Sequence, residues 1–381
     1  MRAAIFDSPE EAMDVRSDVK LAEPSAGQVK VRIKAAGVCH SDLHIRNGDW
    51  DSETPMVLGH EGAGVVTEVG PGVEKVKVGD HVVLSWVAPC GKCAGCLAGQ
   101  PTRCEVLAET VAVLGVLGDG STALSMSDGS SIKHYLGIAS FAQDVVVMES
   151  AAIAVREDIP FDRAALLSCG VPTGVGAAQK TVSIGPEDSV LVIGCGTVGL
   201  SVIQGARMSG SKRIIAVDRV REKLDVAKAV GATDVILADG RDVLAAVREI
   251  VPDGVNYAFD AIGLPIATEQ SIESLANDGT AVIVGMAPQE ARASFNLLRF
   301  GETSQRLIGC NMGEIVPATD IPRLADLYME GELRLDEMVG ETVALDEING
   351  VFESLERGEL LKAIIDPWLG TDSPGGEPEA P

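Results

Sequence analysis

Four cysteines stand close together in the first third of the chain. Cys90, Cys93 and Cys96 are separated by two-residue gaps, and Cys104 follows shortly afterwards. Four thiolates can surround one Zn²⁺ ion tetrahedrally, and such short gaps let a loop fold around the ion. Because all four positions would then be filled, we predict a structural rather than a catalytic zinc site. An iron–sulfur cluster is an alternative, since ferredoxins use a similar spacing, and four unligated thiols are another.

Two further cysteines and a histidine stand apart from that run and could form a second metal site. Cys39, His60 and Cys169 each lie in a short glycine-containing segment. Two thiolates and an imidazole would leave the fourth position of a zinc ion open for water or substrate, as in catalytic sites. Taken singly, each residue has another interpretation, because a lone cysteine is usually a buried apolar residue and a lone histidine an ordinary surface or core residue.

A glycine-rich loop is the third chemical feature. Gly194, Gly196 and Gly199 follow the apolar segment Ser189–Ile193 and precede a predicted helix. Between a strand and a helix, this spacing predicts a dinucleotide site. The first two glycines permit a tight turn and a close approach of the pyrophosphate to the helix N-terminus, and the third permits packing of the helix on the strand.

An acidic residue at the next strand end indicates which dinucleotide binds. Asp218 ends the following predicted strand, nineteen residues beyond Gly199. Its carboxylate would bond the ribose hydroxyls and repel a 2′-phosphate, which favours NAD over NADP. Arg219 and Arg221 could attract that phosphate, so NADP stays an alternative. Cys195, inside the loop, is expected to be a small packing residue rather than a redox switch.

Two patterns of apolar residues divide the chain into two parts. The first part alternates apolar and polar residues in short segments between glycine and proline turns, as half-buried strands do. These predicted strands are Gln28–Ala35, Gly62–Val69, His81–Ser85 and Phe141–Met148. From about residue 171, apolar strands alternate with helices, which is the pattern of a doubly wound parallel sheet. Its predicted strands are Ser189–Gly194, Arg213–Val217, Asp234–Leu237, Asn256–Asp260, Thr280–Val284 and Arg306–Cys310.

The length of 381 residues suits two domains. We expect a mainly β catalytic domain over residues 1–170, a dinucleotide-binding domain over 171–310, and a return to the catalytic domain over 311–369. Within that return, residues 324–366 are expected to be helical with one strand. The tail 370–381 is rich in Gly, Pro and Glu and is expected to be disordered.

The overall charge limits the partners. A formal net charge of −25 at pH 7 argues against nucleic acid and against an anionic membrane surface, since both attract basic proteins. The acids are compatible with an ordinary solvated surface or with a salt-adapted source. The N-terminal segment lacks the apolar core of a signal peptide, and no stretch is apolar enough to span a membrane, so we expect a cytoplasmic protein. A reducing cytosol disfavours structural disulfides.

The segments that carry these motifs resemble, in order and spacing, the zinc-containing medium-chain alcohol dehydrogenases. The resemblance covers about residues 1–366, and the stretch 132–143 is similar to the long-lobed, typically dimeric branch, with a homotetramer as the alternative. It implies an α/β protein with a GroES-like, mainly β domain, a zinc lobe and a Rossmann domain. It also implies two Zn²⁺ ions and NAD(H) in each chain. The matching segments are Gly37–His44, Gly59–Gly64, Cys90–Cys104, Cys169–Gly174 and Gly194–Gly199.

The resemblance assigns roles around the second metal set. It implies that a catalytic zinc is bound by Cys39, His60 and Cys169. Glu61 is implied as a carboxylate that approaches the metal during ligand exchange. Asp42 is implied as the acid that orients His60 by accepting its other ring N–H.

A proton relay is implied beside this metal. Zn²⁺ lowers the pKa of a bound alcohol, so a proton must leave a buried site when hydride departs toward the nicotinamide. Ser41 is implied as the first proton acceptor and His44 as the solvent end of the relay. The alternative is that both residues merely cap a helix start.

Contacts with the cofactor also follow from the resemblance. His40 and Lys362 stand where many relatives have arginines near the pyrophosphate, and this exchanges forked donors for weaker ones. Lys223 matches a position for an additional ribose contact. The implied set is His40, Thr173, Gly194, Gly196, Thr197, Val198, Gly199, Asp218, Lys223, Val284 and Lys362.

Large apolar residues are implied around the alcohol. The implied pocket residues are Trp50, Trp86, Leu136 and Met286. They suit a primary alcohol that is aromatic or of medium length. The glutathione-dependent formaldehyde branch needs an acid where Trp50 stands and an arginine where Ala108 stands, so that activity is not expected, although another thiol adduct, such as that of mycothiol, stays open. A polyol dehydrogenase and a non-enzymatic zinc-ribbon binding protein are further alternatives.

Overall fold

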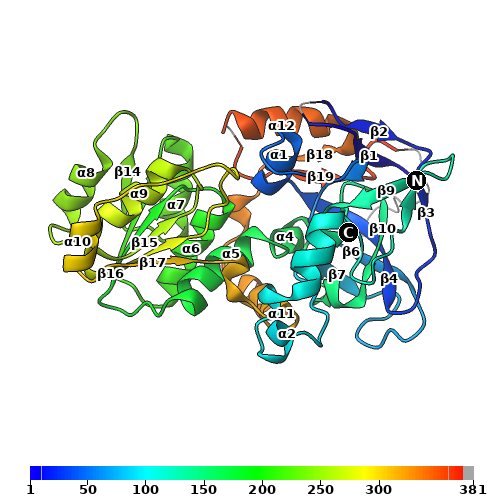
Figure 1. The fold of residues 1–381 in the computed structure, drawn as a ribbon, viewed down its shortest axis with the longest axis horizontal. Coiled ribbons are helices and arrows are strands. Elements are labelled where there is room, and N and C mark those ends of the chain that lie inside the picture. Colours follow the sequence, from blue (N-terminus) through cyan, green and yellow to red (C-terminus); the bar gives the residue numbers. More distant parts are fainter. Residues whose placement is uncertain (10, 359, 372–381) are drawn as a thin grey trace. The chain divides into compact units, whose positions relative to one another are not determined.

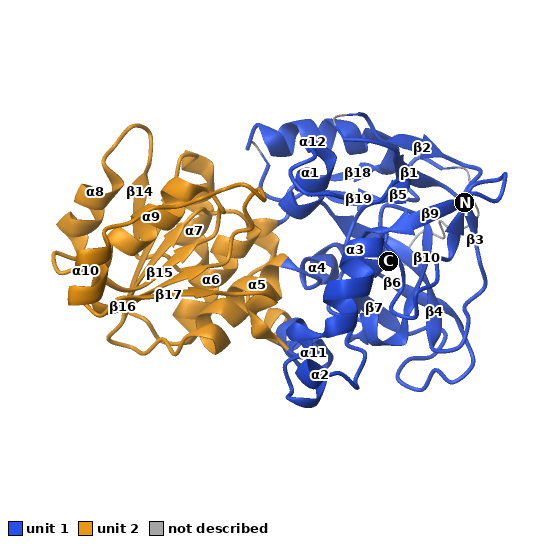
Figure 2. Ribbon diagram, viewed as in Figure 1, with its two compact units in different colours: residues 1–169, 316–326, 339–381 blue, residues 170–315, 327–338 orange. Residues whose placement is uncertain are grey.

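The chain folds into two units, each assembled from more than one stretch of sequence (Figure 2). The computed structural model describes residues 1–9, 11–358 and 360–371. Unit 1 contains Met1–Cys169, Val316–Asp326 and Val339–Pro381, and unit 2 contains Gly170–Ile315 and Leu327–Met338. Among the described residues, no helix combines the length and the apolar character needed to cross a bilayer.

The units differ from the predicted domain ranges in the return segment. Residues 311–315 and 327–338, which we expected in the catalytic domain, belong to unit 2. Residues 327–338 are tied to unit 2 by the side chain of Gln204. Its Nε2 donates to the carbonyl of Arg334 at 3.0 Å, and the N–H of Arg334 donates to its Oε1 at 2.7 Å. Of the tail predicted to be disordered, residues 372–381 lie outside the described residues.

Unit 2 is built on a six-stranded sheet in the order β14-β13-β12-β15-β16-β17, with every neighbouring pair parallel (Figure 1). The strands are β12 (Ser189–Ile193), β13 (Arg213–Asp218), β14 (Asp234–Leu237), β15 (Val255–Asp260), β16 (Leu275–Ile283) and β17 (Arg306–Gly309). Counted from β12, the order is 3-2-1-4-5-6, the doubly wound arrangement that places ligands where the order reverses beside the first strand. The predicted parallel sheet is confirmed.

Helices cover both faces of that sheet because its strands are apolar on both sides. Leu191, Ile193 and Ile215 belong to a buried cluster with residues of α8 and α9. Val192 points to the opposite face, where its side chain lies close to Gly199 in α6. The helices of this unit are α5 (Gly170–Gly176), α6 (Thr197–Met208), α7 (Arg221–Val230), α8 (Val243–Ile250), α9 (Pro265–Glu273) and α10 (Leu297–Glu302).

Unit 1 contains two sheets. One has the order β2-β1-β5-β9-β8-β3, and the other has the order β11-β7-β6-β4-β19-β18 with β10 also paired to β4. The strands are β1 (Ala3–Phe6), β2 (Asp14–Arg16), β3 (Lys20–Leu21), β4 (Gln28–Gly37), β5 (Met56–Val57), β6 (Glu61–Val69), β7 (His81–Leu84), β8 (Leu124–Ser125), β9 (Ser131–His134), β10 (Asp144–Met148), β11 (Ala152–Ala154), β18 (Thr342–Ala344) and β19 (Ile364–Asp366).

Two predicted elements of unit 1 need correction. The strand predicted over Phe141–Met148 begins at Asp144, because Phe141 bonds through its backbone to Ala4 and Leu58 instead of extending the pairing with β4. The segment expected to hold one strand holds two, β18 and β19, which pair in parallel. The helices here are α1 (His40–Arg46), α2 (Ala94–Leu97), α3 (Ala112–Leu114), α4 (Phe161–Leu166), α12 (Ile348–Glu356) and α11 (Pro317–Met329), whose last turn belongs to unit 2.

The long strand β4 positions the chemistry of unit 1. Its residues alternate between buried and partly exposed, as the sequence pattern predicts. In the antiparallel pairing with β6, Gly37 lies opposite Glu61. Cys39 follows Gly37 by two residues and His60 directly precedes Glu61, so the pairing brings both side chains to the same end of the sheet.

The glycine before His60 is required by its surroundings. Gly59 has a φ of +86°, and a Cβ there would lie 2.6 Å from Ser140 Oγ and 2.8 Å from a ring carbon of Phe141. We predict that Gly59→Ala lowers the free energy of unfolding by about 1–2 kcal/mol for the left-handed backbone and by about 1–3 kcal/mol more for the overlap.

The matched control is Gly72→Ala, since Gly72 has a φ of +78° but nothing lies within 4 Å of the added carbon. This variant should lose only the backbone contribution. Urea unfolding followed by fluorescence measures both variants. Equal losses in the two variants would show that the packing around Gly59 does not restrict this position.

Candidate metal centres and dinucleotide site

Cys39 stands at the start of a short helix. It precedes α1 with an extended backbone, and its N–H donates to Asp42 Oδ2 at 3.1 Å, which closes a capping box. The free N–H groups and the dipole at a helix start favour a thiolate. The Cys169 thiol, by hydrogen bonding, holds the pKa of Cys39 well below its ordinary value, and the His60 ring acts in the same direction, while burial opposes both.

Four donor atoms converge at this point of unit 1. The side-chain donors of Cys39, His60, Glu61 and Cys169 all lie within 4.8 Å of one another. His60 and Glu61 are buried, and both cysteines are partly buried. Two soft thiol donors, an imidazole and a carboxylate are the ligands that Zn²⁺ takes in proteins, so the donor set fits a zinc ion.

Asp42 joins the two segments that carry the first two donors. Its Oδ1 accepts the N–H of Gly59 at 3.0 Å and lies 3.3 Å from Nδ1 of His60. Burial acts to lower the pKa of His60, but the Asp42 carboxylate outweighs this and holds that pKa well above its ordinary value. A carboxylate behind a ligating histidine fixes the ring and makes its other nitrogen a better ligand. The position thus fits the orienting role implied for Asp42.

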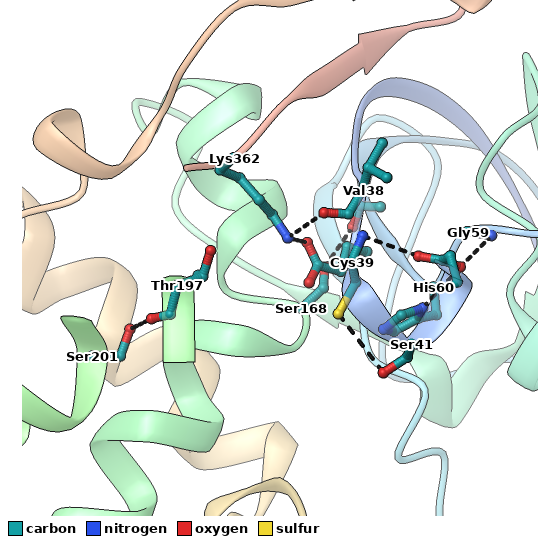
Figure 3. A network of polar contacts seen from close by, with 12 residues as sticks. Val38, Cys39, Ser41, Gly59, His60, Ser168, Thr197, Ser201 and Lys362 are labelled. Carbon is teal, nitrogen blue, oxygen red and sulfur yellow. Dashed lines mark hydrogen bonds and ion pairs between the residues drawn. The ribbon is translucent and has the colours of Figure 1, made fainter. Parts of the chain in front are cut away.

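Glu61 and Lys362 form a buried ion pair beside the donor set. The Nζ of Lys362 contacts Glu61 Oε2 and donates to the carbonyl of Val38 at 3.0 Å (Figure 3). Burial raises the pKa of the Glu61 carboxyl to about 7, although Lys362 counteracts part of this rise. Gly37 leaves room for the pair, since a Cβ there would lie 2.2 Å from Oε2 of Glu61. Lys362, implied as a cofactor contact, is thus directed at Glu61 in unit 1.

The implied relay residues lie on α1. Ser41 Oγ is 3.8 Å from the sulfur of Cys39, and Figure 3 shows both side chains beside His60. His44, one turn later, has its Nδ1 2.7 Å from Asp49 Oδ2. The alternative that Ser41 and His44 cap the helix start does not hold, because Cys39 is the N-cap residue and Asp42 supplies the capping carboxylate.

Three of the four implied pocket residues share one environment. Trp50, Trp86 and Leu136 are partly buried and pack against the same core of unit 1. Leu136 has a φ of +50°, a conformation that is uncommon for residues with a side chain and that recurs near functional sites. Met286 belongs to unit 2, where 56% of its surface is exposed.

Sequence reasoning missed a tyrosine beside the metal set. The ring of Tyr135 meets that of His60 edge-on, with centroids 5.5 Å apart, and its hydroxyl donates to the carbonyl of Ser41 at 3.2 Å. Tyr135 therefore supports both α1 and the histidine. The only signal in the sequence was its place within the stretch 132–143, which pointed to a branch of the family and not to a contact.

The other four cysteines also converge. The sulfurs of Cys90, Cys93, Cys96 and Cys104 lie within 4.8 Å of one another. Backbone N–H groups that point at the sulfurs lower the pKa of Cys93 to about 6 and also lower that of Cys90, whereas burial raises the pKa of Cys96 to about 12. Four sulfurs in one small lobe, with N–H groups that stabilise thiolates, fit a closed zinc site. All eight cysteines are free of disulfide bonds.

The glycine-rich loop of unit 2 follows β12. Gly194 has a φ of +98°, and a Cβ on Gly199 would lie 1.8 Å from the Gly194 carbonyl oxygen. Gly196, directly before α6, differs: its φ of −79° suits any residue, and nothing lies within 4 Å of an added Cβ. The space over Gly196 at the start of a twelve-residue helix fits a pyrophosphate. Cys195 is buried, so it fits the expected packing role.

Asp218 lies at the end of β13, where the ribose site was expected. Its Oδ2 accepts the N–H of Cys195 at 2.7 Å and its Oδ1 accepts that of Val220 at 2.9 Å. The carboxylate is thus fixed beside the glycine-rich loop. Lys223 is half-buried nearby, and burial lowers its pKa although Asp218 acts against this shift.

The remaining implied cofactor residues are distributed over both units. Thr173 and Val284 are buried in unit 2, and Thr197 and Val198 are partly buried in the first turn of α6. His40 is exposed at the first position of α1 in unit 1.

Comparisons with known proteins point to one family. Residues 25–157 match the model of the alcohol dehydrogenase GroES-like domain, and residues 197–330 match that of the zinc-binding dehydrogenases. An S-(hydroxymethyl)glutathione dehydrogenase of Paracoccus denitrificans is 36% identical over 96% of this chain and 99% of its own length.

Solved structures show the same relationship. Benzyl alcohol dehydrogenase from Acinetobacter calcoaceticus is 33% identical with a TM-score of 0.90, covering 96% of this chain and 98% of that one. A zinc-binding dehydrogenase from Sinorhizobium meliloti 1021, solved bound to NADP, is 25% identical with a TM-score of 0.78, covering 96% and 99% of the two chains.

Two glycines of the loop should respond differently to the same substitution. Gly196→Ala adds a methyl group to open space, so we predict unchanged stability and a loss of NADH affinity of tenfold or more, because the methyl group occupies the space proposed for the pyrophosphate. Gly199→Ala places a methyl group against the backbone of Gly194 and should lower the stability of unit 2. Fluorescence titration and thermal unfolding separate the two effects. A Gly196→Ala variant with native NADH affinity would contradict the placement of the cofactor.

Proposed function

We propose that this chain, which belongs to the zinc-containing medium-chain alcohol dehydrogenase family, interconverts a primary alcohol and its aldehyde with NAD(H). The observation that carries this proposal is the convergence of Cys39, His60 and Cys169 with Asp42 behind the histidine. When bound, Zn²⁺ would supply Lewis acidity toward the alcohol oxygen, and NAD would supply the hydride acceptor.

The residues of this chain would then hold the ligands and move one proton. Asp42 keeps the imidazole of His60 oriented, and Tyr135 packs against its edge. Ser41 lies beside Cys39, and we propose that it accepts the alcohol proton while its own proton passes on, with His44 as the next acceptor. The buried Glu61 carboxylate can serve as an alternative metal ligand when substrate and product exchange.

The fixed carboxylate of Asp218 supports NAD as the cofactor. Both of its oxygens are held by backbone N–H groups, so the carboxylate stays beside the glycine-rich loop, where we propose that the ribose binds and where it would repel a 2′-phosphate. NADP is the second candidate, since the relative from Sinorhizobium meliloti was solved with NADP bound.

The residues around the pocket support an apolar alcohol. Two tryptophans and a leucine pack, partly buried, against the core of unit 1, and aromatic rings favour aromatic or medium-chain alcohols. Thiol-adduct oxidation is the second candidate function, because the curated relative from Paracoccus denitrificans carries that activity in its name. Trp50 and Ala108 argue against glutathione itself, while a mycothiol adduct and polyols stay as alternatives. We also propose a homodimer, on the resemblance of residues 132–143.

A panel of alcohols with each cofactor tests the proposal. Benzyl alcohol, ethanol, sorbitol and formaldehyde with either glutathione or mycothiol are incubated with NAD or NADP, and absorbance of the reduced cofactor is followed. We expect the highest kcat/KM for benzyl alcohol with NAD. Cys39→Ala should abolish turnover and leave NADH binding measurable, and persistent turnover in that variant would contradict the proposed site.

The cofactor preference has its own test in Asp218→Asn. Losing a charge-assisted bond to ribose should lower kcat/KM for NAD by about 10–100-fold, since such bonds contribute about 1.5–3 kcal/mol. The value for NADP should fall less, because the repelling charge has gone. A variant with an unchanged ratio of the two values would show that Asp218 does not select the cofactor.

A further inference from the structure

The loop that follows α1 turns back on the helix and brings an acidic residue to His44. Gly48 has a φ of +72°, which reverses the chain, and the N–H of Asp49 then donates to the carbonyl of His44 at 2.9 Å. The carboxylate of the same residue reaches the imidazole, with Asp49 Oδ2 2.7 Å from His44 Nδ1. One residue therefore contacts both the backbone and the ring of His44.

The contact with the ring is not needed to close this turn. The backbone N–H groups of Asn47 and Gly48 already bond to the last turn of α1, at 2.9 and 3.1 Å, and the Asp49 N–H adds a third bond. A residue without a carboxylate could make all three bonds. The carboxylate adds a hydrogen bond to the imidazole ring itself.

This hydrogen bond determines which ring nitrogen of His44 carries the hydrogen. An ionised carboxylate only accepts hydrogen bonds, so at 2.7 Å the Nδ1 atom must be the donor. In the neutral ring the hydrogen then sits on Nδ1, and the lone pair sits on Nε2. Asp49 thus makes Nε2 the basic atom of His44.

The adjacent tryptophan restrains the ring from another side. The indole of Trp50 stacks on the imidazole with centroids 4.5 Å apart and planes inclined by 27°. The His44 side chain is 16% exposed and that of Asp49 is 35% exposed, so the pair lies at the protein surface but is largely covered. A ring with a hydrogen bond at one edge and a stacked face has little freedom to turn.

We propose that Asp49 is a positioning residue for the proton relay. Asp49 fixes the tautomer and the orientation of His44 so that Nε2 receives the proton. The inference rests on the function proposed above. The net change is the release of one proton. The alcohol proton passes to Ser41 Oγ, the original hydroxyl hydrogen of Ser41 passes on through intervening hydroxyl groups or water, the last of which protonates Nε2, and the imidazolium releases a proton to solvent. Throughout, Asp49 keeps the Nδ1 hydrogen bond.

The first test reads the tautomer directly and needs no substrate. The chain has five histidines, so nitrogen NMR on the ¹⁵N-histidine-labelled, zinc-loaded protein can assign each ring by comparison with His44→Gln. We expect His44 to carry its hydrogen on Nδ1 in the wild type and in the control Asp51→Asn. Asp49→Asn should show a mixture of tautomers, because an amide can accept from Nδ1–H or donate to a bare Nδ1.

The second test reads the relay. We expect kcat with benzyl alcohol and NAD to fall about 10–100-fold in Asp49→Asn, a part of the factor that general bases contribute. KM should stay within about twofold, and millimolar imidazole should restore most of the lost kcat, because an external base replaces the misoriented one. Asp51→Asn removes an equal charge from an exposed residue two positions away and should match the wild type.

The outcomes separate this inference from the proposed function. A wild-type His44 that carries its hydrogen on Nε2 overturns the inference, even if Asp49→Asn fails to fold. So does an Asp49→Asn variant with the kcat of Asp51→Asn, or one that imidazole does not rescue. If instead the wild type oxidises no alcohol in the panel, the proposed function fails, while the tautomer measurement still decides whether Asp49 holds the ring.

Discussion

One buried carboxylate holds the candidate active site of unit 1 together. Asp42 accepts hydrogen bonds from the backbone of Cys39 and Gly59 and lies against the ring of His60. A buried charge is costly unless it is fully paired, and here the pairing links the start of α1 to the segment before β6. Two of the metal donors are therefore placed by the same group. Gly59 packs closely against Ser140 and Phe141 because it has no side chain.

The strand pairing makes this linkage possible and adds a second buried charge. Because Gly37 lies opposite Glu61 in the pairing of β4 with β6, the Glu61 carboxylate reaches the donor set and Lys362 fits against it. Such an ion pair keeps a carboxylate at the metal set without leaving its charge uncompensated. Lys362 contacts Glu61 and donates to the carbonyl of Val38, so its side chain acts on the metal donors by compensating the charge of Glu61.

Sequence reasoning reached the features that residue types and local periodicity determine. The fold class was predicted from apolar strands that alternate with helices, the family was inferred from the resemblance of its motifs, and both are confirmed. It missed what depends on contacts between distant segments. Nothing local indicates that Tyr135 packs on His60, that Lys362 pairs with Glu61, or that Gln204 bonds to the backbone of Arg334. Asp49 lies near His44 in sequence, but its effect depends on the left-handed turn at Gly48.

The metal content of the protein shows directly whether each chain binds two separate zinc ions. Protein purified without chelator and dialysed against metal-free buffer is measured by elemental analysis together with its concentration. We expect two zinc ions per chain in the wild type. We expect one in Cys39→Ala, where only the site of Cys90, Cys93, Cys96 and Cys104 stays complete. One zinc ion in the wild type, or two retained in Cys39→Ala, would show that the two sets of donors are not two independent zinc sites.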